Sequence, residues 1–343
     1  MSKILPRGKM YRYCLADIAK GIFNGMIGNY LLYFFQPTAK SGLPALLPEN
    51  KLLGFITIMA LITGLGKIVD AVTDPLVAVL SDKCTHKAGR RIPFLRYAAI
   101  PYAVSVLLIF YAPFPEGSFA NALWVGLFLI VYYTAYTFFF IPRNALVPEI
   151  IPDSKVRVGY YGISTAFFMG SSSFMYAATL FVNLLKNAGL SPLWAWRTVF
   201  TVFSAIGAAC LLLSAYAFEE KDYVTGNVQP KESLLRSFRQ VFQNRNFLCF
   251  TICDLFSGVS MAFFQTAMLY YITMLLNVPE SQSFLVMLSA IAVALCLFPL
   301  IIKLSRRYNK KCPLWLQALC LPWYLALFSS VTKLLPWLPD MNC

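Results

Sequence analysis

The sequence has little charge and almost no histidine. Only 13% of its 343 residues are Asp, Glu, Lys or Arg, and His86 is the single histidine, whereas soluble domains carry about 25% charged residues. The sequence therefore offers too few histidines for a typical zinc-dependent hydrolase or for catalysis that depends on several histidines. A nucleophile elbow and a phosphate-binding loop are also missing, so we expect neither an enzyme nor a cofactor. The nine cysteines show no paired spacing, and we interpret them as small buried apolar residues.

Apolar residues dominate what is present. They make up 59% of the chain, and the mean hydropathy is +0.64. A membrane-spanning helix needs about 20 mostly apolar residues, and the sequence predicts nine such stretches, which indicate an all-α integral membrane protein. The predicted spans are 12–36, 52–80, 94–114, 119–142, 158–186, 193–218, 246–277, 283–303 and 313–336.

The net charge of +14 follows the membrane topology rather than a nucleic-acid surface. Most Lys and Arg residues lie in the N-terminal arm and in the segments after the second, fourth, sixth and eighth spans. The opposite side holds only Lys40, Lys51, Lys186, Arg197 and Lys333. By the positive-inside rule the N-terminus is cytoplasmic, and we expect a multi-pass protein of the cell (inner) membrane that does not bind nucleic acid.

The longest polar interruption divides six spans from three. It predicts an N-terminal six-helix bundle at 1–217, a cytoplasmic loop with an amphipathic helix at 218–245, and a partial C-terminal bundle at 246–343. A weak repeat supports the division, because the second and eighth spans are each followed by a short basic turn that ends in proline: SDKCTHKAGRRIP and KLSRRYNKKCP. Transporters are commonly built from such repeats.

Two acids stand close together inside the second span. Asp70 and Asp74 are one helical turn apart, so both carboxylates can converge on one point, and Thr73 adds a hydroxyl beside them. An all-oxygen set of this kind suits Na⁺ or, with one pKa raised by burial, a proton. Pro75 frees a backbone carbonyl that could join the set. The alternative is a structural ion network in which Asp70 pairs with Lys67 or Lys20.

Further polar residues interrupt other spans. Asp17 and Lys20 lie in the first span, and such intramembrane charges usually face a bundle interior or a watery cavity. For Arg143, at the end of the fourth span, we favour snorkelling to the cytoplasmic surface over contact with substrate or an Asp. Tyr133 and Tyr136 belong to an aromatic run that serves either ordinary packing or stacking against a sugar ring.

The motifs together resemble a known family. DAVTDPLVAVLSDKCTHKAGRRIP, at residues 70–93, resembles the second-span signature of the glycoside-pentoside-hexuronide:cation symporters, which are part of the major facilitator superfamily. YLLYFFQP, IPRNALVPEI, NRNFL and LYYITMLL match further family segments, in family order. The resemblance covers essentially the whole chain and implies a helical-bundle fold of the major facilitator type.

The resemblance also implies roles for individual residues. Asp70 and Asp74 match the acids of the coupling-cation site and are the metal ligands if the ion is Na⁺, with Thr73 in place of an Asn and Thr137 matching a site Thr. Lys20 matches a lysine near the sugar. The predicted substrate-binding residues are Asp17, Lys20, Tyr133, Tyr136, Asn144 and Thr165. The predicted structural or gating residues are Lys67, Asp82, Arg90, Arg91 and Arg143.

The sequence departs from the family at its sugar clamp. Gly21 and Phe140 stand where the family has acids, Asn144 replaces a Trp, and a family Arg falls near Ser164 or Thr165. Galactoside transport is therefore not implied. The family has twelve helices, so a nine-span chain is expected to be C-terminally truncated.

The implied function is a monomeric symporter that couples a sugar or glycoside to Na⁺, H⁺ or Li⁺ by alternating access in the lipid bilayer. The alternatives are a truncated or non-transporting membrane relative, or a transporter of a lipid-like or other non-sugar solute.

Overall fold

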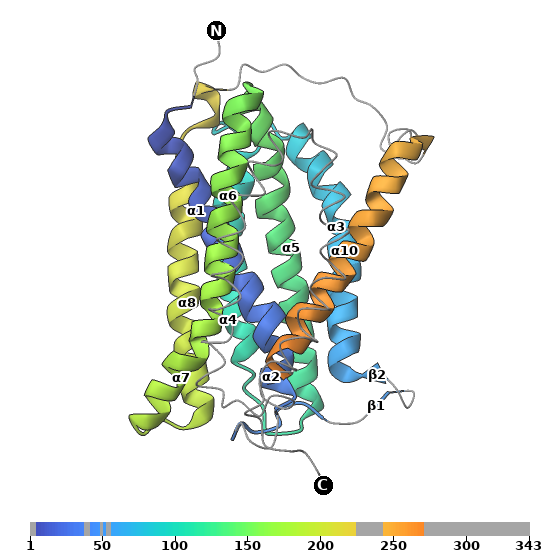
Figure 1. Ribbon diagram of the computed structural model, residues 1–343, viewed down its shortest axis with the longest axis vertical. Helices are drawn as coiled ribbons and strands as arrows, with labels where there is room; N and C mark the ends of the chain where they lie inside the picture. The colour runs from blue at the N-terminus through green and yellow to red at the C-terminus, as the bar shows by residue number, and fades with distance from the viewer. Residues whose placement is uncertain (1–4, 38–41, 49–50, 53–55, 224–242, 271–343) are drawn as a thin grey trace, which may run out of the picture. The chain divides into compact units, whose positions relative to one another are not determined.

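The computed structural model describes residues 5–37, 42–48, 51–52, 56–223 and 243–270, all within the unit Met1–Tyr270. The helices of these residues are joined by loops and turns, and there are two short antiparallel strands, β1 (Lys51–Leu52) and β2 (Ile56–Thr57) (Figure 1). The long helices are α1 (Arg7–Gly25), α3 (Ile58–Lys83), α4 (Ile92–Phe110), α5 (Phe119–Ile150), α6 (Ser154–Phe174), α8 (Pro192–Ala215) and α10 (Arg245–Tyr270). The shorter pieces are η1 (Met26–Tyr30), α2 (Leu31–Phe35), η2 (Met175–Ala177), α7 (Ala178–Asn187) and η3 (Glu220–Asp222).

Each of the first six predicted spans corresponds to helix in the structure, and α10 begins where the seventh was expected. The fourth differs most, because α5 continues through Pro142 and Pro148 to Ile150 instead of ending at 142. Arg143, Leu146 and Val147 are buried on this extension, so packing outweighs the local cost of the prolines. The eighth and ninth predicted spans and most of the loop at 218–245 lie outside the described residues. The count of nine and the domain boundaries therefore stay predictions.

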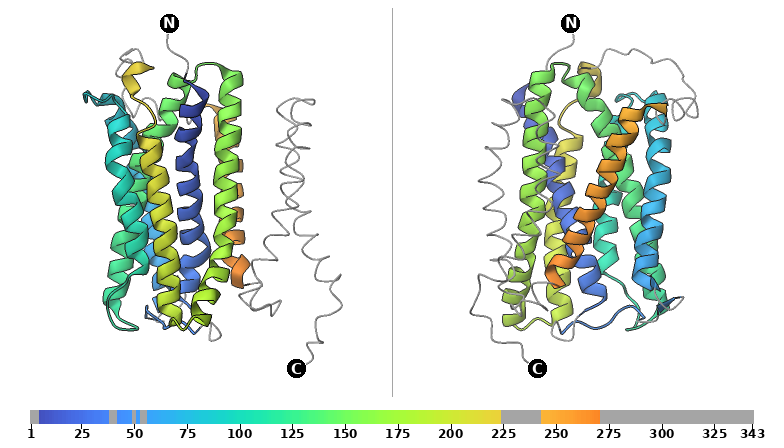
Figure 2. Two further views of the ribbon diagram at one scale, coloured as in Figure 1. Left: turned by 90° about the vertical axis from the view of Figure 1, so that its left-hand side faces the viewer. Right: turned by 45° about the vertical axis from the view of Figure 1, so that its right-hand side comes forward.

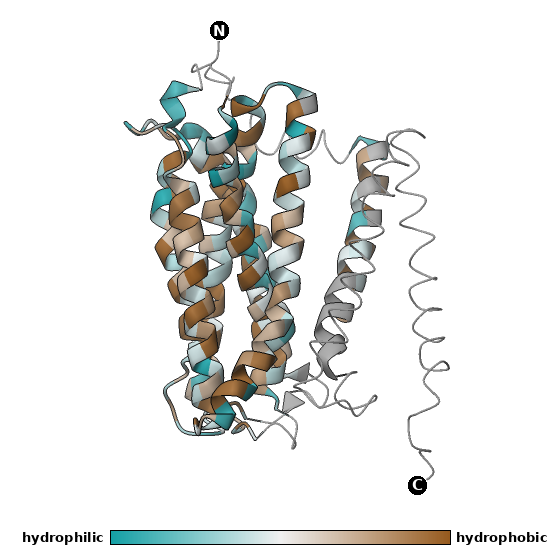
Figure 3. Cartoon of the chain, turned by 60° about the vertical axis from the view of Figure 1, so that its left-hand side comes forward, coloured by the Kyte–Doolittle hydropathy of each residue, from teal (hydrophilic) through white to brown (hydrophobic). Residues whose placement is uncertain are grey.

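Four helical segments in the described part of the chain are long and apolar enough to cross a membrane: Ile92–Phe110, Phe119–Ile150, Val156–Asn187 and Pro192–Asp222. The segment of α3 is not among them, since Lys67, Asp70 and Asp74 interrupt its apolar run. Hydrophobic residues, drawn in brown, lie along much of the length of the helices in Figure 3. Large apolar side chains such as Leu123 and Val202 are exposed, which suits a surface in contact with lipid.

Close helix contacts organise this unit. α1 packs against both α6 and α8, and α5 packs against both α3 and α4; α1 lies between α8 and α6 in the left view of Figure 2. A Cβ atom added at Gly21 would stand 2.5 Å from the backbone oxygen of Phe168 on α6. Small residues at such contacts let membrane helices approach closely. Gly21 therefore serves α1–α6 packing, and an acid at this position would strike the α6 backbone.

Candidate functional site

The two acids of α3 meet a hydroxyl of α5. Asp70 and Asp74 share one face of α3 because they are four residues apart, and α3 packs against α5. The Thr137 Oγ1 atom lies 3.2 Å from Asp70 Oδ1 and 2.9 Å from Asp74 Oδ1, and Thr137 is fully buried. Three oxygen atoms from two helices therefore converge on a small volume. The Thr137 hydroxyl has one proton, so it can donate to only one of the two carboxylates at a time.

Thr73 faces its own helix in this arrangement. Its hydroxyl donates to the backbone carbonyl of Asp70 over 3.1 Å and so makes a local bond instead of a bond to either carboxylate. Pro75 lies inside α3, where it has no N–H to donate to the carbonyl of Ala71. The carboxylate pair and Thr137 are thus the oxygen groups that the fold brings together here.

Lys67 approaches the same cluster from its exposed side. Its Nζ atom lies 3.7 Å from Asp70 Oδ2 and 4.3 Å from the ring centroid of Tyr133. The Lys67 side chain is 64% exposed, against 20% for that of Asp70, so solvent screening makes this a weak pair. Asp74 has no cationic partner within 4.0 Å in the described part of the chain. The predicted Lys67–Asp70 pairing and the convergence of the two acids therefore coexist.

Lys20 of α1 reaches a cavity beside this cluster. Its Nζ atom lies 5.3 Å from the ring centroids of Phe140 and Phe168 and 5.7 Å from that of Tyr136, which are cation–π distances. No carboxylate of the described residues lies within 4.0 Å of this ammonium. The cavity has a volume of about 290 Å³ and is lined by Lys20, Asn24, Ile27, Gly28, Lys67, Asp70, Tyr102, Tyr132, Tyr133 and Tyr136.

Five predicted site residues line this cavity together: Lys20, Lys67, Asp70, Tyr133 and Tyr136. Asn24 and Tyr102 also line the cavity, although neither was predicted as a site residue. Asn24 follows Lys20 by one helical turn, a spacing that puts both on one face, so it could have been found. Tyr102 sits in an otherwise ordinary apolar span with no such signal.

Asp17 and Arg143 form a separate, buried ion pair. The Arg143 guanidinium donates to both oxygens of Asp17 over 3.1 and 2.7 Å and to the backbone carbonyl of Tyr13 over 3.0 Å. Ser164 of α6 also donates to Asp17. The Arg143 side chain is only 2% exposed, so the snorkelling interpretation is wrong and the alternative of contact with an Asp is confirmed. Without such partners the buried guanidinium would be an uncompensated charge and would destabilise the fold.

Three predicted substrate residues do not line the cavity. The carboxylate of Asp17 is occupied by Arg143 and Ser164, and Asn144 and Thr165 are exposed on α5 and α6. Their assignment to substrate stays a prediction.

The loop after α3 holds a network of ion pairs. Arg91 donates to Asp82 and to Glu149, both over 2.8 Å, and Arg90 donates to Glu149 over 3.1 Å. Burial lowers the pKa of Arg91, but its bonds to Asp82 and Glu149 outweigh this and raise the pKa above its ordinary value, so the guanidinium stays charged. The predicted residues Asp82, Arg90 and Arg91 thus tie the ends of α3, α4 and α5 together.

Glu220, which was not predicted as a site residue, caps the start of α4. Its Oε2 atom accepts from the backbone N–H groups of Arg91 and Ile92 over 2.8 and 3.0 Å, and the residue is 2% exposed. A carboxylate at a helix N-terminus is favoured by the helix dipole and by the unpaired N–H groups. Residues 128 and 129 positions apart in sequence make these bonds, so no local pattern reveals them.

Replacing Glu220 with Gln is expected to lower the free energy of unfolding by about 1–2 kcal/mol, because a neutral amide oxygen accepts these bonds less strongly than a carboxylate. Thermal unfolding in detergent measures the loss. The matched control is Glu219→Gln, whose carboxylate pairs with Arg96 while 55% exposed and should cost about 1 kcal/mol or less. Equal losses in the two variants would contradict the capping role.

Apolar helices of membrane length with charged side chains buried between them are typical of a multi-pass membrane transporter. The chain belongs to the MFS/sugar transport protein family, whose model matches residues 12–334, and this confirms the predicted relation to the glycoside-pentoside-hexuronide:cation symporters. The family consists of transporters and not of enzymes.

Named relatives are symporters and permeases. The chain is 30% identical to an uncharacterized symporter of Synechocystis over 237 residues, 64% of this chain and 40% of that protein. It is 24% identical to the inner membrane symporter YicJ of Escherichia coli over 284 residues, 81% of this chain and 57% of the relative. It is 23% identical to a lactose permease of Lactobacillus helveticus over 250 residues, which are 69% of this chain and 38% of the permease. The matches thus span roughly two fifths to three fifths of each relative.

The described residues contain no group of three or more His, Cys, Asp or Glu side chains able to hold a metal ion. The α3–α5 cluster offers two carboxylates and a hydroxyl, a set of hard oxygen donors of the kind that binds hard cations such as Na⁺ or Li⁺.

Proposed function

We propose that this protein is a symporter that couples a monovalent cation to a sugar or glycoside. The observation that carries the proposal is the convergence of Asp70, Asp74 and Thr137 from two helices. A Na⁺ or Li⁺ ion would lie among these oxygens and relieve the repulsion between the carboxylates. A proton would relieve the same repulsion by neutralising one acid.

The cavity beside this cluster supports a solute site next to the cation. Tyr133 and Tyr136 offer ring faces, and Lys20 and Asn24 offer hydrogen-bond donors. Asp70 belongs to both the cation cluster and the cavity lining, so an ion bound to it changes the charge that the solute meets. By reciprocity, whatever the ion adds to solute affinity the solute adds to ion affinity. Alternating access of two bundles, with a cytoplasmic N-terminus, completes the proposed mechanism.

Uptake by the full chain in proteoliposomes tests the proposal. A panel of radiolabelled sugars and glycosides is offered under inward Na⁺, Li⁺ or H⁺ gradients, with protein-free liposomes as the control. We expect at least one sugar to accumulate against its gradient only when one of these cations is supplied. Sugar accumulation that is the same with and without each cation gradient would refute coupling.

A second measurement separates the competing function. Thermal unfolding in NaCl, LiCl and KCl reports cation binding without transport, since a ligand that binds the folded state stabilises it. Stabilisation by Na⁺ or Li⁺ without uptake of any sugar would favour the non-transporting relative or a transporter of another solute.

A further inference from the structure

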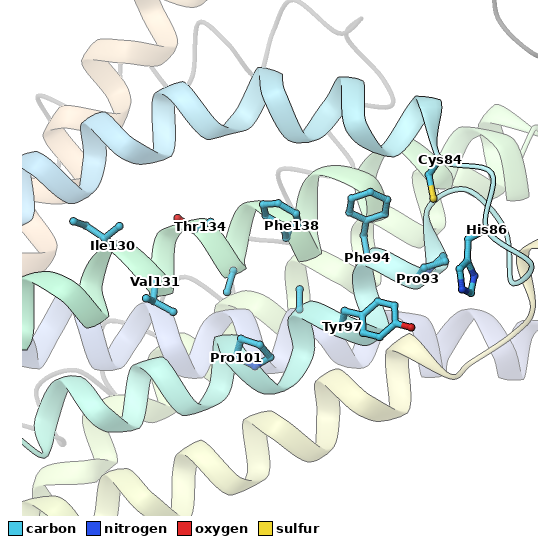
Figure 4. Close-up of a pocket in the computed structure, with 12 residues that line it drawn as sticks. Cys84, His86, Pro93, Phe94, Tyr97, Pro101, Ile130, Val131, Thr134 and Phe138 are labelled. Carbon is cyan, nitrogen blue, oxygen red and sulfur yellow. The ribbon is translucent and has the colours of Figure 1, made fainter.

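A second, larger pocket lies away from the cation cluster. It has a volume of about 540 Å³, within the range of about 300–1,000 Å³ for ligand sites. α4 and α5 supply its walls, and Cys84 and His86 of the loop after α3 close one end (Figure 4). We call it the α4–α5 groove. Its lining residues are Cys84, His86, Pro93, Phe94, Tyr97, Ala98, Pro101, Ile130, Val131, Thr134, Ala135 and Phe138.

The groove is apolar along its length and polar at one end. Ile130, Val131 and Phe138 of α5 face Phe94 and Pro101 of α4 across it. From residue 130 to residue 138 an α-helix rises about 12 Å, close to the roughly 15 Å depth of one leaflet's hydrocarbon. A sugar would find few hydrogen-bond partners in this space, whereas a hydrocarbon chain would need none.

Two groups that can donate hydrogen bonds, His86 and Tyr97, lie at the closed end. His86 Nδ1 accepts from the backbone N–H of Ala88 over 3.1 Å, which leaves Nε2 to carry the proton and to donate. The Tyr97 hydroxyl points toward this end in Figure 4, and the residue is 74% exposed.

Two lysines stand beside the residues that close the groove. Lys83 and Lys87 adjoin Cys84 and His86 in the sequence, and both are exposed. No carboxylate in the described part of the chain lies within 4.0 Å of either ammonium. Arg90 and Arg91 of the same loop differ, since both are paired with acids. Within the described part of the chain, the ammonium groups of Lys83 and Lys87 are therefore available to bind an anionic ligand.

We propose that the α4–α5 groove binds an anionic phospholipid. One acyl chain lies along the apolar walls, and the phosphate is held at the closed end by Lys83, Lys87 and the His86 Nε2–H. Basic pockets between transmembrane helices suit anionic headgroups, and here two exposed lysines adjoin in sequence the residues that close one end of an apolar groove.

Native mass spectrometry of the full chain tests the site with phosphatidylglycerol and phosphatidylcholine of the same acyl chains. Each lysine near an anionic headgroup contributes about fivefold in affinity. The double variant Lys83→Gln/Lys87→Gln should therefore weaken phosphatidylglycerol binding on the order of 20- to 30-fold. Lys221→Gln, an exposed lysine elsewhere, should leave the binding unchanged. Equal retention of the two lipids by the wild type, or an unchanged double variant, would overturn the proposal.

A groove-filling variant tests the acyl chain separately. Thr134→Phe places a ring in the groove at a half-buried position and should lower the retention of phosphatidylglycerol several-fold. Ala166→Phe, at an exposed position of α6, is its control. Glycerol phosphate at millimolar concentration should not displace the lipid. Displacement, or normal retention by a folded Thr134→Phe protein, would show a phosphate site without an acyl groove and would refute the proposal.

Discussion

Replacing Arg143 with Met is expected to lower the free energy of unfolding by roughly 3–5 kcal/mol, because Asp17 is left as a buried charge without its partner. The pair is among the most enclosed polar groups described, with side chains 2% and 7% exposed. The loss is measured by thermal unfolding in detergent. The variant should also unfold when a mild detergent is replaced by a harsher one at a temperature that the wild type survives.

The double variant Asp17→Asn/Arg143→Met is the decisive control. Removing both charges should restore much of the lost stability, since replacing a whole buried pair costs far less than breaking it. Arg90→Met provides a matched comparison, because its pair with Glu149 is about one quarter exposed on each side and should cost about 1 kcal/mol. A double variant no more stable than Arg143→Met would show that packing of the arginine, and not charge pairing, is what matters.

The same pair links two parts of the candidate site. Asp17 precedes Lys20 by three residues on α1, and Arg143 follows Thr137 by six on α5. The pair therefore fixes α1 against α5 near the cavity that both helices line. The buried bond to Arg143 accounts for the charge of Asp17 inside the membrane span, and the role with substrate that was predicted for Asp17 stays a prediction.

Local geometry made part of this site predictable from the sequence. Apolar runs of membrane length predicted the helices. The four-residue spacing of Asp70 and Asp74 predicted that both lie on one face of α3 without knowledge of any tertiary contact. Thr137 could be placed beside them only through the family resemblance, because 63 residues separate it from Asp74.

Contacts between distant residues could not be predicted from the sequence. Arg143 pairs with an acid 126 positions away, and its place near a span end favoured snorkelling on local grounds. Gly21 looked like a lost sugar-binding acid, but its neighbour on α6 leaves no room for one. Phe140 likewise stands in place of an acid, and its ring faces the ammonium of Lys20. Each of these depends on which helices pack together, and a single sequence does not contain that information in local form.

Replacing Asp74 with Asn should remove cation dependence while keeping the fold. In the proposed site Asp74 has no cationic partner within 4.0 Å among the residues that the structure describes, whereas Asp70 is also paired with Lys67. The amide relieves the repulsion between the two acids, so the cation-free variant should be as stable as the wild type or more stable. Its stabilisation by Na⁺ or Li⁺ should vanish, with at least a tenfold loss of cation affinity. Thermal unfolding over a cation titration measures both effects.

Three further variants complete the test of the cluster. Asp70→Asn should also abolish cation stabilisation, but it leaves Lys67 without its acid and should not gain stability. Thr137→Val keeps the side-chain shape and removes one oxygen, so its loss of cation affinity should be smaller, about tenfold or less. Glu116→Gln, an exposed acid in the loop before α5, should behave as the wild type. An Asp74→Asn protein that is still stabilised by the cation at wild-type concentrations would exclude this cluster as the coupling site. If the coupling ion is a proton, the same variant mimics the protonated state, and it should exchange sugar across the membrane without accumulating it in response to a pH gradient.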